Sequence, residues 1–224
     1  MRPALLRRLV TVLSAPGSTM VTRTGPDGPR PRPGAALALL SRAWRRWQED
    51  ADNALRHDPA ARNRAEVTLA YSTMHAIWAH RLSALLWRRR HPLAARLVSQ
   101  LARAATGVEI HPGATIGRRF FIDHGTGVVI GETAEIGDDV MFYHGVTLGG
   151  RSPMARGKRH PTLEDGVMVG AGASILGPVV VGRGAKVGSN AVVTRNVRAG
   201  ATVVGVPARE RTPAEAAQEP EWHI

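Results

Sequence analysis

Histidines and carboxylates gather in four short stretches of the sequence, and these stretches are its clearest candidates for chemistry. They are GVEIHPG with Glu109 and His111, FFIDHGTG with Asp123 and His124, MFYHG with His144, and GKRHP with Lys158, Arg159 and His160. A histidine backed by a carboxylate is the usual general-base pair, because the carboxylate orients the imidazole and stabilises the imidazolium. Glu109 and His124 are fifteen residues apart. If the chain coils back at about that interval, His124 becomes a candidate base and Glu109 its partner.

The other histidines have simpler explanations. His111 fits a residue that caps a corner of the backbone, and His144 fits an outer face or a subunit boundary. His75 and His80 fall in a helical stretch, where either packing or a place beside a substrate would explain them. Catalytic zinc needs three protein ligands converging on one ion with a position left open. Closely spaced histidine pairs are missing from residues 107–209, so we expect no metal site.

These stretches lie in a region that repeats with a period of six. Branched aliphatic residues recur at every sixth position from Leu163 to Val193, and small or β-branched residues recur two places before them. A helix repeats at 3.6 residues and a strand at 2, so neither alone explains this period. A strand that turns a corner once per hexad does explain it, and hexads are typical of parallel β-helices. The aliphatic positions are Leu163, Val169, Ile175, Val181, Val187 and Val193.

The same period runs upstream in two phases. Ile110 to Val128 keep one phase, and Ile130 to Leu148 keep another that is shifted by two residues around Gly125–Gly127. The polar, Gly-rich stretch between Leu148 and Leu163 is expected to leave the coils as a loop. We therefore predict a left-handed parallel β-helix over residues 107–209 with one extruded loop.

The flanking segments differ in character. Apolar residues at helical spacing predict a helical domain over residues 35–106, which makes the fold class α+β. Residues 1–34 are rich in Pro, Gly and Arg and are expected to be a disordered or weakly helical extension. Residues 210–224 are expected to be a flexible tail.

Composition limits the classes of function. Cysteine is absent, which excludes disulfides, thiolate metal sites and a cysteine nucleophile. No apolar run is long enough to span a membrane, and no secretory signal is evident, so we expect a cytoplasmic protein. The net charge is +12, but only Lys158 and Lys186 of the 30 basic residues are lysines. Without a motif that reads nucleic acid, this arginine bias does not indicate a nucleic-acid partner.

Several motifs together resemble one family of enzymes. EIHPGATIG, DHGTGVVIGET, GVTLGG, GKRHPTLEDG and VVGVPAR, with the helical stretch RHDPAARNRAEVTLAYSTMHAIWAHRL, are similar to serine O-acetyltransferases of the hexapeptide-repeat superfamily. The resemblance covers roughly residues 43–209.

The resemblance implies a role for individual residues. His124 matches the catalytic base, and Glu109 matches its carboxylate partner, which is Asp in many members. Asp58 and Asp123 match residues that hold the amino group of serine, while Arg159 and His160 match residues around its carboxylate. The positions matching the coenzyme A site are Gly150, Ala171, Lys186 and Ser189.

The implied reaction is direct transfer of acetyl from acetyl-CoA to the hydroxyl of L-serine, a step of cysteine biosynthesis. Acetyl-CoA would be a co-substrate, and no further cofactor is expected. Two alternatives remain open from the residues alone: a related O-acetyltransferase acting on a sugar or another small hydroxyl acceptor, and a non-enzymatic β-helix. Asp58 and Arg159 favour an amino acid, because such a substrate needs one anionic and one cationic contact.

The resemblance also implies partners. We expect a homotrimer with active sites between neighbouring coils, and a hexamer built from two trimers remains open. In many members a tail ending in Ile docks into cysteine synthase, which points to Ile224. Trp222 and His223 differ from the small or acidic residues common before that Ile.

Overall fold

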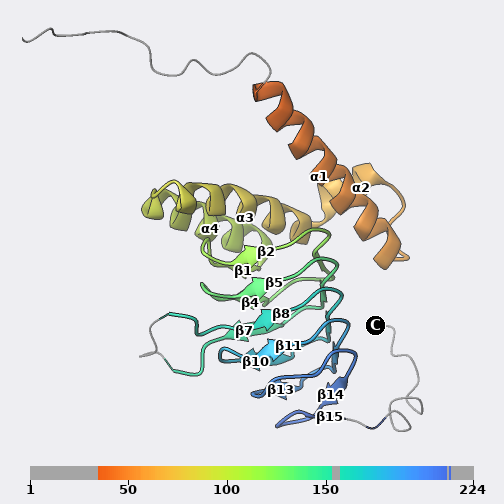
Figure 1. Ribbon diagram of the computed structural model, residues 1–224. Coiled ribbons are helices and arrows are strands. Elements are labelled where there is room, and N and C mark those ends of the chain that lie inside the picture. Colours follow the sequence, from red (N-terminus) through yellow and green to blue (C-terminus); the bar gives the residue numbers. More distant parts are fainter. Residues whose placement is uncertain (1–34, 153–156, 211, 213–224) are drawn as a thin grey trace, which may run out of the picture.

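The computed structural model describes residues 35–152, 157–210 and 212. Four helices come first and a stack of coils follows, with the helices gathered at one end of the stack (Figure 1). The helices are α1 (Ala35–His57), α2 (Arg64–Ala70), α3 (Ser72–Arg88) and α4 (Pro92–Thr106).

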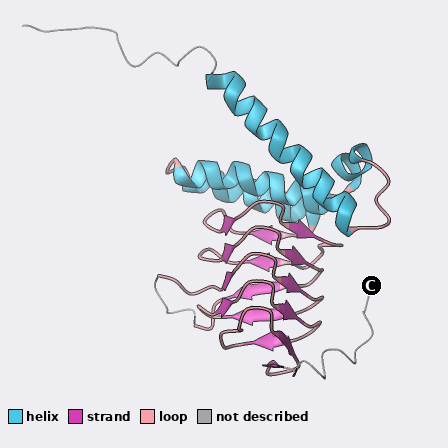
Figure 2. Cartoon of the chain, turned by 45° about the vertical axis from the view of Figure 1, so that its right-hand side comes forward, coloured by secondary structure: helices cyan, strands magenta, loops and turns pink. Residues whose placement is uncertain are grey.

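Helices α3 and α4 lie side by side across the end of the coil stack (Figure 2). Helix α4 starts with Pro92, where the missing N–H has no partner to lose, and its C-cap is Gly107 with a left-handed φ of 72°. From its inner face, the Ser99 hydroxyl donates to the Ile110 carbonyl at 2.7 Å. This bond ties α4 to the first strand of the stack.

Helix α1 is fixed to α3 by a buried ion pair. The Asp50 carboxylate accepts from two guanidinium nitrogens of Arg81 at 2.5 and 2.8 Å, and from the indole N–H of Trp78 at 3.1 Å. Asp50 is 2% exposed. A bidentate pair of this kind defines an orientation as well as a contact, so it sets the angle at which α1 leaves the helical region.

The coils form a prism with three faces. The first face contains β1 (Glu109–Ile110), β4 (Val129–Ile130), β7 (Thr147–Gly149), β10 (Ser174–Leu176) and β13 (Val192–Val193). The second contains β2 (Thr115–Ile116), β5 (Glu135–Ile136), β8 (Thr162–Leu163) and β11 (Val180–Val181). The third contains β3 (Phe121–Ile122), β6 (Met141–Phe142), β9 (Met168–Val169), β12 (Lys186–Val187), β14 (Thr202–Val204) and β15 (Arg209–Glu210).

Neighbouring strands in each face are parallel, apart from β15, which runs antiparallel to β14. The hexad residues point inward: Ile130, Leu148 and Ile175 are each at most 1% exposed and stack in consecutive coils of the first face. One inward aliphatic per side of each coil is the arrangement that the period of six predicted. The left-handed β-helix following a helical region is thus confirmed.

Spacing along the first face shows where the coils depart from the regular repeat. Strand partners there are Glu109, Val129, Thr147, Ser174 and Val192, so successive steps are 20, 18, 27 and 18 residues. The first coil therefore carries two extra residues, as the phase shift in the sequence indicated. The third step carries nine extra residues, which fall in the segment between β7 and β8; the described parts of that segment, 150–152 and 157–161, lead away from the stack and back to it (Figure 1).

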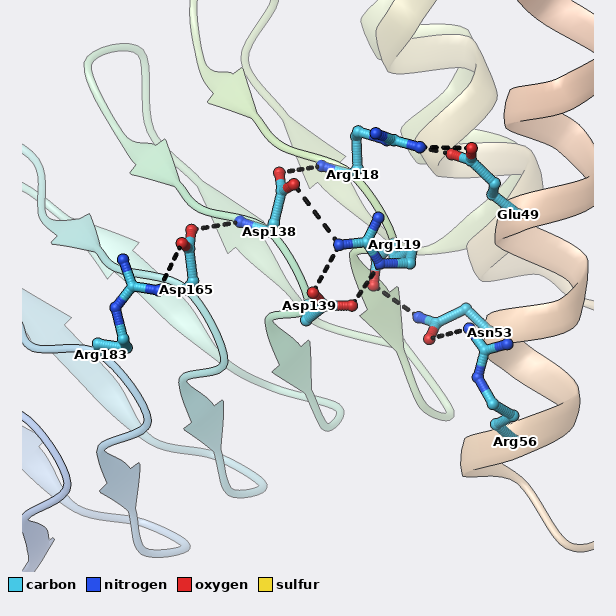
Figure 3. Close-up of polar contacts among 9 residues, drawn as sticks. All are labelled: Glu49, Asn53, Arg56, Arg118, Arg119, Asp138, Asp139, Asp165 and Arg183. Atoms are coloured by element: carbon cyan, nitrogen blue, oxygen red, sulfur yellow. Dashed lines mark hydrogen bonds and ion pairs between the residues drawn. The ribbon is translucent and has the colours of Figure 1, made fainter.

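Each coil has three corners. We number each corner by the face that it follows, so that the first corner comes after the first face. Paired charges run along the second corner (Figure 3). Asp138 accepts from the Arg118 backbone N–H at 2.7 Å, and Asp165 accepts from the Asp138 backbone N–H at 2.9 Å. On the helical side, the Asn53 side chain of α1 donates to the Arg119 carbonyl at 2.6 Å. The C-terminal half of α1 is thereby fixed against the first coil.

Candidate active site

A cleft of about 610 Å³ opens where the helical region meets the third corner of the stack. Its walls come from the loop after α1, the junction of α2 and α3, and the third corners of the first two coils. Cleft-lining titratable side chains brought together from separate elements are the default candidates for an active site. Those in this cleft include Asp58, Tyr71, Asp123, His124 and Tyr143.

His124 projects from the two-residue insertion of the first coil. Below the insertion, Gly127, Gly145 and Gly172 stack closely in the third corner, since a Cβ on Gly145 would lie 3.3 Å from the Gly172 Cα. The extra residues precede this column, and His124 takes a left-handed φ of 59° among them. Few non-glycine residues adopt this conformation, and those that do are enriched at functional sites. The His124 side chain is 54% exposed at the cleft.

The ring of His124 has acidic and aromatic neighbours. Its Nε2 lies 3.7 Å from Asp123 Oδ2, and its centroid lies 5.9 Å from that of His144. Glu109 Oε2 lies 3.2 Å from Arg103 Nη1 at the end of α4. Among the contacts of the described residues, Glu109 is therefore paired with Arg103 and not with His124.

Asp58 lies directly after the last residue of α1. Its Oδ1 accepts from the Ala60 backbone N–H at 2.8 Å, the local bond that an Asp-Pro turn favours. Its Oδ2 accepts from the Tyr71 hydroxyl. Two fixed donors thus hold this carboxylate at the wall of the cleft.

Arg159 and His160 lie at the first corner, where the extruded loop rejoins the stack. Arg159 pairs with Glu132 at 2.8 Å. The Nδ1 of His160 accepts from the Thr133 backbone N–H at 3.1 Å, so its Nε2 carries the proton of the neutral ring. Burial, followed by the charge of Arg159, lowers the pKa of His160. The ring lies against Gly131, where a Cβ would be 2.1 Å from its Nε2.

The first and third corners lie at opposite ends of the strands of the first face. The Asp58, Asp123 and His124 side chains line the cleft at the third corner, whereas Arg159 and His160 do not reach it within one chain.

The four residues expected at coenzyme A lie lower in the stack. Gly150 follows β7 at the first corner, and Ala171 follows β9 at the third corner. Lys186 is an outward residue of β12 on the next coil, and Ser189 lies in the turn after it. They are spread along the stack, as positions for an extended ligand would be.

Comparisons with known proteins bear on this arrangement. Residues 160–195 match the family model described as bacterial transferase hexapeptide (six repeats). Serine acetyltransferase from Bacillus subtilis is 54% identical over 166 residues, which cover 74% of this chain and 76% of the relative. The chain belongs to the serine acetyltransferase family.

Solved serine acetyltransferases have the same fold. The Neisseria gonorrhoeae enzyme in complex with serine matches with a TM-score of 0.73 and 39% identity, covering 78% of this chain and 71% of that one. The Brucella abortus enzyme in complex with coenzyme A matches with a TM-score of 0.74 and 37% identity, covering 78% and 69%.

Two residues that line the cleft, Tyr71 and Tyr143, were not predicted from the sequence. They are the two tyrosines of the chain, and both line the same cleft. Burial raises the pKa of Tyr71 and of Tyr143, with Asp58 adding to the first shift and Asp123 to the second. The one feature of the sequence that could have pointed to them is the rarity of tyrosine in this chain.

Three expectations concern what the described residues do not show. No group of three or more His, Cys, Asp or Glu side chains among them could hold a metal ion. Of the helices described, none has the length and apolar character needed to cross a membrane. The expected N-terminal extension (1–34) and most of the tail, including Ile224, lie outside the described residues.

Proposed function

We propose that this chain transfers the acetyl group of acetyl-CoA to the hydroxyl of L-serine, giving O-acetylserine and CoA. The observation that carries the proposal is the cleft that Asp58, Asp123 and His124 line together. Two carboxylates suit the ammonium of an amino acid, and an exposed imidazole beside them suits deprotonation of its hydroxyl. Membership of the serine acetyltransferase family supports the same substrates.

His124 acts as the base in this mechanism. It takes the proton of the serine hydroxyl while the oxygen attacks the thioester carbonyl, because a neutral hydroxyl is a weak nucleophile. The tetrahedral intermediate then expels the CoA thiolate, and the imidazolium returns the proton to that sulfur. No acyl-enzyme forms. Much of the acceleration comes from aligning two bound substrates.

Glu109 is the proposed carboxylate partner of His124, although its Oε2 is paired with Arg103. The second oxygen of the carboxylate remains free to accept from the imidazole. Catalytic hydrogen bonds are often long before substrates bind and shorten in the complex. We therefore assign to Glu109 the stabilisation of the imidazolium, with Arg103 holding its other oxygen.

The site is completed by a neighbouring copy of the chain. Arg159 and His160 at the first corner cannot meet the cleft at the third corner of their own chain, but two prisms packed side by side can bring these corners together. Three copies around one axis would form three such sites, so we propose a homotrimer. A hexamer would form if the helical regions of two such trimers packed together.

An assay of purified protein with acetyl-CoA and a panel of acceptors tests the function. With L-serine as acceptor, the protein should release CoA at a rate far above the rate with water, sugars or an amino sugar. Faster turnover with a sugar hydroxyl would favour the related O-acetyltransferase. If no acceptor in the panel led to release of CoA, an enzymatic role would be contradicted.

The tail and the location complete the proposal. Ile224 is proposed to dock into the active site of cysteine synthase, where its terminal carboxylate would imitate a substrate carboxylate and its side chain would fill an apolar pocket. Deleting Ile224 should abolish binding to cysteine synthase, measured by calorimetry, and leave acetyl transfer unchanged; equal binding of both forms would refute this role. We also propose that the protein acts in the cytoplasm.

A further inference from the structure

The Asp58 carboxylate is held at both oxygens before any substrate is present. Its Oδ2 accepts from the Tyr71 hydroxyl, and its Oδ1 accepts from the Ala60 N–H at 2.8 Å. A carboxylate offers about four lone-pair positions, so each oxygen still has one free for a ligand in the cleft. The Ala60 bond is local to the turn, whereas the Tyr71 bond reaches across from another element.

Tyr71 is itself anchored. It is the single residue between α2 and α3, with an extended backbone (φ −84°, ψ 99°). Its carbonyl accepts from the Met74 N–H at 3.1 Å in the first turn of α3, and its ring packs against the hydrophobic core. The hydroxyl therefore cannot leave Asp58 without a rotation of the ring or a shift in the start of α3.

The phenol keeps its proton under all conditions in which the enzyme would work. Burial raises the pKa of Tyr71, and the bond to Asp58 raises it further. A protonated hydroxyl can only donate to a carboxylate, so this bond fixes which lone pairs of Asp58 face the cleft. A long-range anchor matters here because Asp58 lies in a loop, at the end of α1, without a helix of its own.

We propose that Tyr71 is a positioning residue for Asp58 and thereby sets the preference for acceptors that carry an α-ammonium group. This inference rests on the proposed function, because the ammonium in question is that of serine. Tyr71 does not touch the reacting atoms; it holds the carboxylate that does the recognition.

The test is Tyr71→Phe, which removes one oxygen and keeps the ring. Its KM for L-serine should rise about 10-fold, the scale of one hydrogen bond to a charged group, while its KM for acetyl-CoA stays the same and kcat changes far less. 3-Hydroxypropanoate keeps the hydroxyl and the carboxylate of serine but lacks the ammonium. The ratio of kcat/KM for L-serine over this acceptor should fall by the same factor.

A double-mutant cycle separates positioning from a structural role. If Tyr71 acts through Asp58, then Tyr71→Phe should change nothing further in an Asp58→Ala background. The matched comparison is Tyr143→Phe, which removes the same atom from another wall of the same cleft. Its effect should add to that of Asp58→Ala, because the Asp58 oxygens are held by Tyr71 and Ala60.

An equal effect of Tyr71→Phe in both backgrounds would overturn the inference, as would a rise in both KM values together or an unchanged acceptor ratio. The outcomes are distinct from failure of the proposed function. If the unaltered chain does not acetylate serine, the function is wrong; if it does and Tyr71→Phe behaves like the unaltered chain, only the role of Tyr71 is wrong.

Discussion

His124 is placed by its backbone. Its ring lies 3.7 Å from the Asp123 carboxylate and 5.9 Å from the His144 ring, and neither contact is tight enough to hold it. The left-handed φ of 59° and the turn bond from the Gly125 N–H to the Asp123 carbonyl at 2.7 Å direct the side chain into the cleft. The imidazole is thus free to rotate toward a substrate while its Cα stays fixed.

The base and its carboxylate should respond differently to truncation. His124→Ala should lower kcat by roughly 10²–10⁴-fold, because general-base catalysis contributes on that scale. Glu109→Gln should cost less, since it removes only the charge that stabilises the imidazolium. Stopped-flow or steady-state release of CoA measures both. Near-normal kcat in His124→Ala, with the fold intact by circular dichroism, would end the proposed mechanism.

At this scale the sequence led to some site residues and could not lead to others. Asp58, Asp123 and His124 were assigned together from motifs, and all three line one cleft. Arg159 and His160 lie at another corner, a separation that depends on how the coils turn and that no motif spacing reveals. The Tyr71–Asp58 bond spans thirteen residues across α2, so nothing local in the sequence marks it.

At the scale of elements, the contact between α3 and the third corner controls where the cleft residues lie. Gly125 has a φ of 78°, and a Cβ there would lie 2.1 Å from the Thr73 Cγ2 and 3.3 Å from the Val108 Cγ2. The start of α3 therefore presses directly on the turn that carries His124.

Gly125→Ala should push this corner away from α3 and lower kcat/KM by at least about 10-fold, since both a clash and a left-handed conformation oppose the new methyl. Thr73→Ser removes the clashing Cγ2, so the double variant Gly125→Ala/Thr73→Ser should recover part of the loss. Steady-state kinetics measures the recovery. If Thr73→Ser made the double variant worse, the clash would not be the cause.

Helix α3 also carries a buried histidine that should make the protein sensitive to acid. Burial, with smaller contributions from Arg81 and Arg88, lowers the pKa of His80 to about 4, and its Nδ1 has no hydrogen-bond partner in the described part of the chain. Between pH 6.5 and 4, His80 binds a proton in the unfolded state but stays neutral in the folded state. Stability should therefore fall as the pH drops through this window, by about 3 kcal/mol in all.

His80→Gln should flatten that slope, measured as the free energy of unfolding in urea at pH 7, 5.5 and 4. Some slope should remain, because the pKa values of His111 and His160 are lowered in the same direction by burial. His91→Gln, at an exposed histidine, is the matched control and should keep the full slope. If His80→Gln left the slope unchanged, groups other than His80 would be the cause of the acid sensitivity.

The elements were more predictable than the site because their cause is local and repeated. Each hexad aliphatic, such as Val169 or Ile175, is buried for the same reason in every coil. The two extra residues in the first coil and the loop after β7 were visible as breaks in phase. The buried pair of Asp50 and Arg81, which joins residues thirty-one apart, has no such periodic signal.

At the scale of the whole molecule, the proposed division of the site between two corners gives a test of assembly. In the proposed trimer, His124→Ala and Arg159→Ala would each remove one half of every site. When the two variants are unfolded, mixed in equal amounts and refolded, random trimers should contain sites with both halves intact in about a quarter of cases. Activity at low serine should recover to that fraction of the unaltered enzyme.

Mixing without refolding should recover far less activity, because the subunits of the proposed trimer would then stay with their original partners. No recovery after refolding, in a sample that elutes as a trimer, would place both halves of the site within one chain or would require a different neighbour.

Strand β15 limits the end-to-end association of coil stacks. A stack of parallel coils has no inherent last member, since its final coil offers a row of free backbone groups to any further strand. Here the chain reverses: β15 covers β14 in the antiparallel sense, and residues 205–208 meet the edge of β13, with Gly205 O and Ala208 N both bonded to Val192. At the opposite end α3 and α4 form a lid.

These two closures differ in kind. The helical lid is thick and packed into the core, whereas the reversal at β15 is a two-residue strand. If the β15 end alone were uncovered, two copies could associate through their β15 ends. Association would end at two copies, because the outer end of each would be covered by its helices. A filament would require both ends to be open, and the helices that build the cleft are therefore also what keeps this prism finite.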